Sequence, residues 1–218
     1  MIRFNTLHLP HFIVFEGVDG SGKTTLARAL KQYYIAVAPD LLLYADAFPG
    51  SIPGTLGEWV YRFHHKKVAD APSPDTIAPP ALQLLHIAAH VDALLTRILP
   101  TIEKNGSVIL DRYWWSTYSY LRISLPARQV WPIVSIEHTF LEQLPSPTII
   151  YLTRKTSLKP DELSTAVHTQ LDTYYHEVME YEQQRNPRIF QLSNDNSIEQ
   201  TWTTLLATLG LPYGPLNL

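Results

Sequence analysis

Cysteine is absent from this chain of 218 residues, which excludes disulfide bonds and thiolate metal sites. No run of about 18 consecutive apolar residues occurs, so we expect no membrane-spanning helix. The N-terminus also lacks a charged stretch followed by a long apolar one. The formal net charge is −3, so the chain has no basic field to attract a nucleic-acid polymer or an anionic membrane. These absences predict a soluble, cytoplasmic protein that has neither nucleic acid nor membrane as a partner.

Helical and extended patterns alternate along the whole chain, which predicts the α/β class with a parallel sheet covered by helices. With 45% hydrophobic residues, the chain can fill one core, so we expect a single domain over residues 1–218. The five expected strands lie near residues 12–16, 41–46, 107–111, 148–153 and 189–192. The expected helices lie near residues 23–34, 55–65, 80–103, 114–123, 135–143, 162–184 and 197–209.

Two segments between these elements interrupt the alternation. Four prolines fall within residues 69–80, which predicts a loop beside the second helix. Residues 154–160 follow a strand end and are short and basic, so we expect a small lid over about 154–162 on the ligand-binding side of the sheet. The stretch Ala81–Leu95 is apolar on more than one face, which predicts a buried central helix.

Residues 12–25 join an apolar strand to the pattern Gly-x-x-x-x-Gly-Lys-Thr and then to a helix. Glycines in such a loop let backbone N–H groups turn toward a polyphosphate, because no Cβ stands in the way. Lys23 would reach the β- and γ-phosphates, and the Thr24 hydroxyl would take a Mg2+ position. The sequence therefore predicts a nucleotide-binding loop, whose candidate residues are Gly17, Asp19, Gly20, Ser21, Gly22, Lys23, Thr24 and Thr25.

A second apolar strand, at residues 107–111, ends in Asp111 followed by Arg112 and Tyr113. Beside a phosphate loop, Asp111 could hold the water shell of a metal, while Arg112 could clamp phosphoryl oxygens with two hydrogen bonds. The alternative is a capping aspartate followed by a surface arginine. A charge at the end of a buried strand is costly without a ligand or partner, which favours the functional interpretation.

At this point the chain resembles a known family. Phe-Glu-Gly-x-Asp-Gly-x-Gly-Lys-Thr-Thr, followed by Asp-Arg-Tyr-x-x-Ser, is similar to the thymidylate kinases, and the resemblance covers about residues 10–155. Residues 48–58 resemble the acceptor segment of that family, and residues 84–89 resemble the start of its base-recognition helix. The resemblance implies the P-loop kinase fold, a homodimer, and ATP-dependent phosphorylation of a deoxynucleoside monophosphate, dTMP above all, with Mg2+.

The resemblance also implies roles for individual residues. Asp19 would contact the acceptor sugar, although it could also simply form the turn. Thr24 and Asp111 would hold the metal and its waters. The implied catalytic residues are Lys23, Asp111, Arg112 and Arg154. The implied acceptor-binding residues are Asp19, Phe48, Pro49, His86, His90, Arg112, Ser116 and Tyr120.

Several positions depart from the family pattern. His86 and His90 replace an aromatic residue and an arginine of the base-recognition helix, and they could contact the base or phosphate, bind a metal or fill the core. Leu121 replaces an amide, and Ala47 stands where an arginine is expected. Arg62, His64 and His65 of the following helix either substitute for that arginine or form the solvated face of the helix. The lid offers one arginine, Arg154, which is either a catalytic finger or a surface charge.

These departures leave two further functions open. A deoxynucleoside kinase would not need the missing acceptor-phosphate arginine, but it would require a general base such as Glu16. A non-catalytic nucleotide-binding module would explain a lid with few arginines. The paired Trp114 and Trp115 either wall the acceptor pocket or pack in the core.

Overall fold

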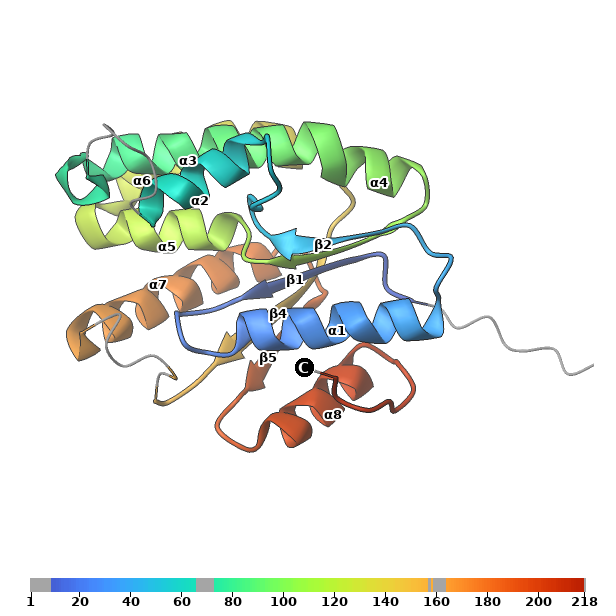
Figure 1. The fold of residues 1–218 in the computed structure, drawn as a ribbon. Helices are drawn as coiled ribbons and strands as arrows, with labels where there is room; N and C mark the ends of the chain where they lie inside the picture. Colours follow the sequence, from blue (N-terminus) through green and yellow to red (C-terminus); the bar gives the residue numbers. More distant parts are fainter. Residues whose placement is uncertain (1–8, 66–72, 157, 159–163, 218) are drawn as a thin grey trace, which may run out of the picture.

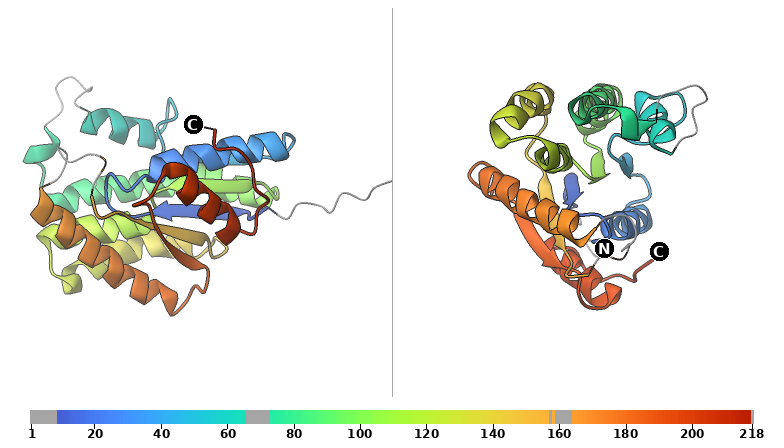
Figure 2. Two further views of the ribbon diagram at one scale, coloured as in Figure 1. Left: turned by 90° about the horizontal axis from the view of Figure 1, so that it is seen from below. Right: turned by 90° about the vertical axis from the view of Figure 1, so that its left-hand side faces the viewer.

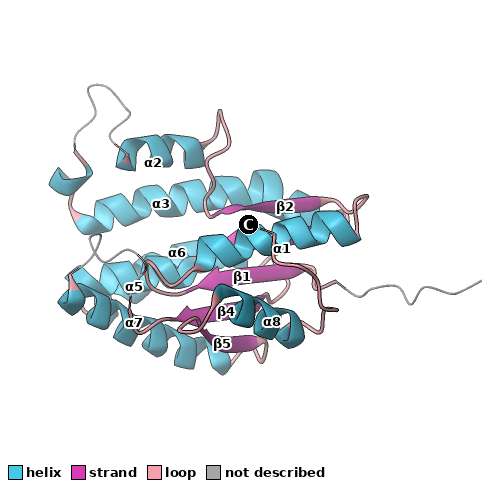
Figure 3. Cartoon of the chain, turned by 60° about the horizontal axis from the view of Figure 1, so that its bottom comes forward, coloured by secondary structure: helices cyan, strands magenta, loops and turns pink. Residues whose placement is uncertain are grey.

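The computed structural model describes residues 9–65, 73–156, 158 and 164–217 (Figure 1). Its centre is a five-stranded parallel sheet in the order β2-β3-β1-β4-β5, which confirms the predicted fold class (Figure 3). Continuous apolar runs form β1 and β3 because helices cover both faces of the sheet, so every residue of these two strands is buried. The strands are β1 (Phe12–Glu16), β2 (Leu43–Ala47), β3 (Ser107–Asp111), β4 (Thr148–Thr153) and β5 (Ile189–Ser193).

Helices form a layer on each side of the sheet, as Figure 2 shows. Alternation along β1 divides the core: Ile13 and Phe15 face α1 and α8, whereas Phe12 and Val14 face the larger layer that contains α3, α5, α6 and α7. α2 packs on the outside of α3. The helices are α1 (Lys23–Val37), α2 (Leu56–His64), η1 (Pro74–Thr76), α3 (Pro79–Ala93), η2 (Leu94–Ile98), α4 (Leu99–Glu103), α5 (Trp114–Ser124), α6 (Ala127–Leu141), α7 (Thr165–Gln183) and α8 (Ile198–Thr208).

The apolar helix expected at residues 80–103 differs from the prediction in two ways. It contains a π-helical turn, η2, just before Pro100, which lacks an N–H group and needs more room than an α-helical turn gives. It is also not buried all round, because Leu84 and Leu95 are 43% and 44% exposed. By length and composition alone the run Pro79–Glu103 could cross a membrane, a test that the core helix of a soluble protein also passes.

α6 begins at Ala127, eight residues before the start that the sequence predicted. Pro132 lies inside this helix and gave a misleading signal for a helix end. The buried positions Val130, Val134, Glu137 and Leu141 follow a helical spacing, so burial of this stripe outweighs the proline. The other predicted elements are present with small shifts at their ends. Lys159 and most of the expected lid lie outside the described residues.

The buried carboxylate of Glu16, the last residue of β1, ties the sheet to the start of α5. Its Oε1 accepts hydrogen bonds from the backbone N–H groups of Tyr113 at 2.7 Å and Ser116 at 3.1 Å. Its Oε2 accepts from the Ser116 hydroxyl at 2.8 Å. Glu16 is therefore an acceptor for two backbone N–H groups at the beginning of α5. Burial raises its pKa from 4.5 to about 7, although the Ser116 hydrogen bond and the charge of Arg112 oppose the shift.

We expect Glu16 to make the stability of the protein depend on pH. A carboxyl group whose pKa is raised by folding stabilises the folded state at low pH, and this contribution is lost as pH rises through about 7. The free energy of unfolding should therefore fall between about pH 4.5 and 7, by up to about 3 kcal/mol relative to a Glu16→Gln variant. Urea unfolding of both proteins across this range measures the difference. If the free energies of unfolding of the two proteins change equally with pH, the raised pKa of Glu16 is wrong.

Candidate active site

The loop between β1 and α1 has the backbone conformation that the glycine pattern predicts. Gly17, Gly20 and Gly22 have φ angles of 140°, 76° and 102°. A Cβ on Gly17 would lie 2.2 Å from the carbonyl oxygen of Leu152 in β4, so the loop and the neighbouring strand touch directly. No side chain caps the first turn of α1, which leaves its N–H groups free for an anion. The loop therefore has the backbone geometry that a cradle for phosphate groups requires.

Lys23 lies across this cradle. Its Nζ donates to the carbonyl oxygen of Val18 at 2.9 Å, and the side chain is only 4% exposed. Burial and the charge of Arg112 lower its pKa to about 8, while Asp19 and Asp111 act in the opposite direction. The ammonium group therefore carries a positive charge at neutral pH. It lies at the phosphate loop, as the sequence predicts. Thr25 follows at the third residue of α1.

Asp111, at the end of β3, forms the second part of the site. Its Oδ2 accepts a hydrogen bond from Thr24 Oγ1 at 2.5 Å, whereas its Oδ1 is buried and has no partner among the described residues. One hydroxyl and one carboxylate are hard oxygen donors, a pair that suits Mg2+ with most of its waters retained. The orphaned Oδ1 and the adjacent cradle therefore fit a Mg2+ ion bound with a nucleotide.

Arg112 stands at the junction between the phosphate loop and α5. Its backbone has a φ of 80°, and its N–H group donates to Phe15 O at 2.9 Å, which continues the β1 to β3 pairing beyond Asp111. The guanidinium donates to Asp19 and, at 3.1 Å, to Ser116 Oγ. Asp19 also accepts from the hydroxyl of Tyr120. The structure thus brings together four of the residues predicted to bind the acceptor.

Tyr175 of α7 belongs to the same network, although the sequence indicated only core packing for it. Its hydroxyl lies 2.9 Å from Ser116 Oγ and 3.4 Å from the guanidinium of Arg112. The ring is fully buried, and burial raises the pKa of Tyr175 well above its usual value. The sequence does hold a signal for Tyr175. A tyrosine on the buried stripe of a helix needs a partner for its hydroxyl, and a predicted buried charge such as Arg112 can be that partner.

The two histidines of α3 lie in different surroundings. His90 is buried, stacks on Phe48 with ring centroids 4.1 Å apart, and places Nδ1 2.8 Å from Glu137 Oε1. His86 Nε2 lies 2.7 Å from His64 Nε2 of α2, and burial together with the neighbouring cations lowers the pKa of His86 to about 3. Within the described part of the chain no three such side chains are arranged to hold a metal, so the structure adds no third ligand to this pair.

Phe48 and Pro49 belong to a short segment that leaves the end of β2. Phe48 N donates to Asp111 O at 2.9 Å, so this segment is fixed to the strand that carries the acidic residue. Asp46 accepts hydrogen bonds from Ala47 N at 2.8 Å and Ser51 N at 3.4 Å, which closes the turn. These contacts hold Phe48 against both Asp111 and His90.

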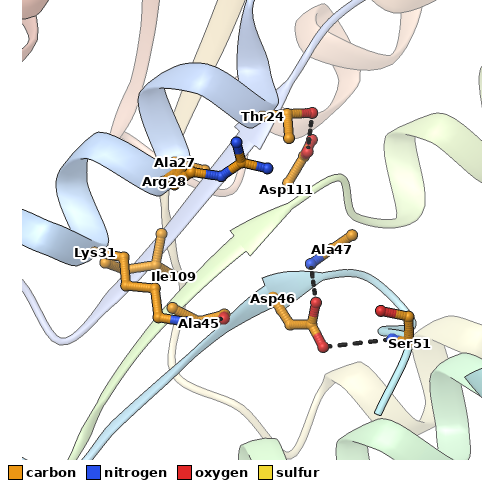
Figure 4. Close-up of a pocket in the computed structure, with 10 residues that line it drawn as sticks. All are labelled: Thr24, Ala27, Arg28, Lys31, Ala45, Asp46, Ala47, Ser51, Ile109 and Asp111. Atoms are coloured by element: carbon orange, nitrogen blue, oxygen red, sulfur yellow. Dashed lines mark hydrogen bonds between the residues drawn. The ribbon is translucent and has the colours of Figure 1, made fainter. Parts of the chain in front are cut away.

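A cleft of about 290 Å³ opens between α1, β2 and this segment (Figure 4). In Figure 4 the guanidinium of Arg28 extends from α1 toward the side of the cleft where Thr24 and Asp111 meet. Small side chains, among them Ala47 and Ser51, form the opposite wall. The cleft therefore reaches the predicted metal position from the β2 edge of the sheet.

Asn194, just beyond β5, supports the phosphate loop from the other side, a role that no sequence motif indicates. Its Nδ2 donates to Ser21 O at 2.8 Å, its Oδ1 accepts from Thr201 Oγ1 at 2.8 Å, and it is 1% exposed. The guanidinium of Arg154 donates to the carbonyl oxygen of Asn194 and, at 2.8 Å, to that of Thr156. Arg154 is thus held beside the β5–α8 connection, and its role as a catalytic finger stays a prediction.

The remaining predicted groups have clear positions. Trp114 and Trp115 are 2% and 0% exposed and belong to the larger core cluster, which favours packing over the pocket wall. Arg62 forms an ion pair with Glu58 on the surface of α2 at 4.0 Å. Leu121 is fully buried.

A glycine cradle that leads into a helix N-terminus, with an acidic strand end beside it, defines a P-loop nucleotide-binding protein. The family model described as thymidylate kinase matches residues 15–201, and the chain belongs to this family. A probable thymidylate kinase of Pyrococcus abyssi is 33% identical over 110 residues, which are 50% of this chain and 51% of that protein. A thymidylate kinase of Chlamydia caviae is 35% identical over 113 residues, 52% and 50% of the two chains.

A third relative, a probable thymidylate kinase of Methanococcoides burtonii, is 32% identical over 143 residues, 64% of this chain and 63% of that protein. In these comparisons the chain spans about half to two thirds of the length of its curated relatives. The crystal structure of thymidylate kinase from Ehrlichia chaffeensis superposes with a TM-score of 0.70 over 92% of this chain and 98% of that one. The identity is 18%, so this likeness confirms the fold.

Gly17→Ala should abolish nucleotide binding. The added Cβ would meet backbone of β4 at 2.2 Å, and the φ of 140° is unfavourable for alanine. Gly210→Ala is a matched control, because Gly210 has a φ of 67° and no atom within 4 Å of an added Cβ, so it should lose only about 1 kcal/mol of stability. Calorimetric titration with ATP and thermal unfolding measure both effects. Equal ATP affinity in the two variants would contradict the close contact.

Asn194→Ala should weaken ATP binding, although we do not expect Asn194 itself to contact the phosphates. Loss of the amide leaves Ser21 O and Thr201 Oγ1 with one partner fewer, which costs about 1–3 kcal/mol of stability and loosens the loop. We expect the KM for ATP to rise more than the KM for the acceptor. Thr203→Ala, an exposed substitution on α8, serves as the control. An unchanged KM for ATP would show that Asn194 is structural only.

Proposed function

We propose that this protein transfers a phosphoryl group from ATP to a deoxynucleoside monophosphate, with dTMP as the preferred acceptor. The observation that supports this most directly is Arg112, which joins the phosphate cradle to the network of Asp19, Ser116 and Tyr120. A cation between a donor site and a polar acceptor site suits a reaction in which two phosphates meet. Membership of the thymidylate kinase family supports the same reaction.

The acceptor phosphate is already an oxyanion, so the protein has to position it and neutralise charge rather than remove a proton. Lys23 would exchange the Val18 carbonyl for the transferring phosphoryl group. Arg112 would hold phosphoryl oxygens by exchanging its hydrogen bond to Ser116 Oγ for one to the phosphoryl group. Thr24 and Asp111 would hold Mg2+, which supplies charge neutralisation at the β- and γ-phosphates when it is bound.

The deoxynucleoside kinase alternative has no support in the geometry. A nucleoside hydroxyl needs a general base, and Glu16 was the candidate for it. Both oxygens of Glu16 accept hydrogen bonds from Tyr113 and Ser116, and the side chain is 0% exposed. The carboxylate thus serves as the cap of α5, and a monophosphate acceptor suits the site better.

We infer a cytoplasmic enzyme with small nucleotides as partners. The outer surfaces of α2 and α3 expose large apolar side chains, which supports the expected homodimer. The side chains on these two helices that are more than 40% exposed are Leu56, Trp59, Tyr61 and Leu84.

A coupled ATP-consumption assay across nucleoside monophosphates and nucleosides tests the proposal. We expect turnover with dTMP and little with thymidine. Lys23→Ala should reduce kcat by at least about a hundredfold while the thermal unfolding midpoint stays similar, because its charge acts mainly on the transferring group. Lys104→Ala, an exposed change at the end of α4, should keep full activity. ATP binding without phosphorylation of any acceptor would favour the non-catalytic module instead.

A further inference from the structure

Arg28, in the second turn of α1, is a cation that the rest of the site leaves without a partner. It follows Thr24 by one helical turn, so the two side chains lie on the same face of α1. The residue is exposed, and it has no hydrogen bond or ion pair with any other described residue. Arg112 and Arg154, in contrast, are held by the carboxylate of Asp19 and by carbonyl oxygens. The guanidinium of Arg28 is therefore free to bind a ligand.

The carboxylates around Arg28 do not neutralise its charge. Asp46 and Asp111 line the same cleft as Arg28, yet neither forms an ion pair with it in the described part of the chain. The two oxygens of Asp46 accept hydrogen bonds from the backbone N–H groups of Ala47 and Ser51. Oδ2 of Asp111 accepts from the hydroxyl at the start of α1. The cation thus faces the cleft without a counter-ion from the protein.

The charged side chains of α1 are all positive. Lys31 lies one turn after Arg28 and lines the same cleft, where it donates to Ala45 O at 3.4 Å. The sequence of α1 contains no aspartate or glutamate. Two like charges one turn apart on a helix repel each other, and the N-terminal end of the helix adds further positive character. An anion in the cleft would remove this repulsion, so the charge pattern favours an anionic ligand.

We propose that the cleft between α1 and β2 binds a phosphate monoester and that the guanidinium of Arg28 holds it. The proposal rests on the function proposed above, because the phosphate of the acceptor nucleotide is the group that this site would receive. It assigns a binding role to a residue that lies outside both the phosphate loop and the Asp-Arg-Tyr motif.

A phosphate group matches the charges of this cleft better than a carboxylate does. In Figure 4 the guanidinium of Arg28 points toward the meeting point of Thr24 and Asp111, where the donor set fits Mg2+. Two cations in one cleft need a ligand with more than one negative charge. A phosphate monoester carries a charge of about −2 at neutral pH, and two of its oxygens can accept from one guanidinium. Arg28 would neutralise the side of this phosphate that faces α1.

The wall opposite Arg28 leaves room for such a group. Ala47 and Ser51 form this wall, and both side chains are small. The hydroxyl of Ser51 has no hydrogen-bond partner among the described residues and can donate to a phosphate oxygen. Phe48, between them, is fixed to β3 by the hydrogen bond from its N–H group to Asp111 O at 2.9 Å. Elements that are already held in place therefore bound the cleft on both sides.

Calorimetric titrations of the whole chain with dTMP, ATP and inorganic phosphate, each alone, test the proposal without turnover. Arg28→Ala should raise the Kd for dTMP by about tenfold or more, because a charge-assisted hydrogen bond to the phosphate is lost. The Kd for ATP should change by less than about twofold. Arg128→Ala is the matched control and should leave both constants unchanged. Arg128 is also an exposed arginine without a described partner, and it lies on α6, in the helical layer on the other face of the sheet.

A second variant tests whether the charge acts in the cleft itself. Ala47→Arg places a guanidinium on the opposite wall, and in the Arg28→Ala background it should recover part of the affinity for dTMP. Arg28 is exposed, so its replacement should leave the thermal unfolding midpoint close to that of the wild type. A loss of dTMP binding would then not come from unfolding.

Two results would overturn the proposal: an unchanged Kd for dTMP in Arg28→Ala, or a loss of ATP affinity as large as the loss for dTMP. In the second case Arg28 would serve the donor nucleotide instead. If only inorganic phosphate depends on Arg28, the cleft takes free phosphate, and the acceptor is overturned as its source. If the wild-type protein phosphorylates no monophosphate, the proposed function fails. Loss of dTMP or phosphate binding in Arg28→Ala would still support the phosphate site in that case.

Discussion

The buried carboxylate of Glu16 is the contact on which the rest of the site depends. It joins the end of β1, where the phosphate loop begins, to the first turn of α5, where Arg112 and Ser116 stand. A carboxylate is placed there because the first N–H groups of α5 are buried and need an acceptor. This contact therefore holds the start of the phosphate loop against the start of α5, although 97 residues separate Glu16 from Tyr113 in the sequence.

Around this contact, each charged group of the site has an ion-pair or hydrogen-bond partner. Arg112 is paired with Asp19, Thr24 bonds to Asp111, and Lys23 bonds to the carbonyl oxygen of Val18. Groups that would be costly to bury alone are thereby held in place before any ligand binds. One oxygen of Asp111 is left without a partner, at the position where a metal would be expected.

The sequence predicted well what depends on local pattern. The five strands, the order of the helices and the residues of the phosphate loop follow from apolar runs and from glycine spacing, because each is fixed by interactions within a few residues. The start of α6 was predicted poorly, since Pro132 suggested a helix end that burial of its apolar stripe overrides. The contacts of Tyr175 with Ser116 and of Asn194 with Ser21 were not predicted, because these partners lie 59 and 173 residues apart in the sequence.

By itself, the sequence determined the glycine loop between β1 and α1 and the position of Asp111 and Arg112 beside it, since strand ends of a parallel sheet meet at one edge. Only the tertiary structure decided what His86 and His90 can do. The same two imidazoles could have been ligands, base readers or core residues, because a histidine takes its chemistry from its hydrogen-bond partners. Packing of α2 and α6 against α3 places His64 beside His86 and Glu137 beside His90, so the two imidazoles have different hydrogen-bond partners.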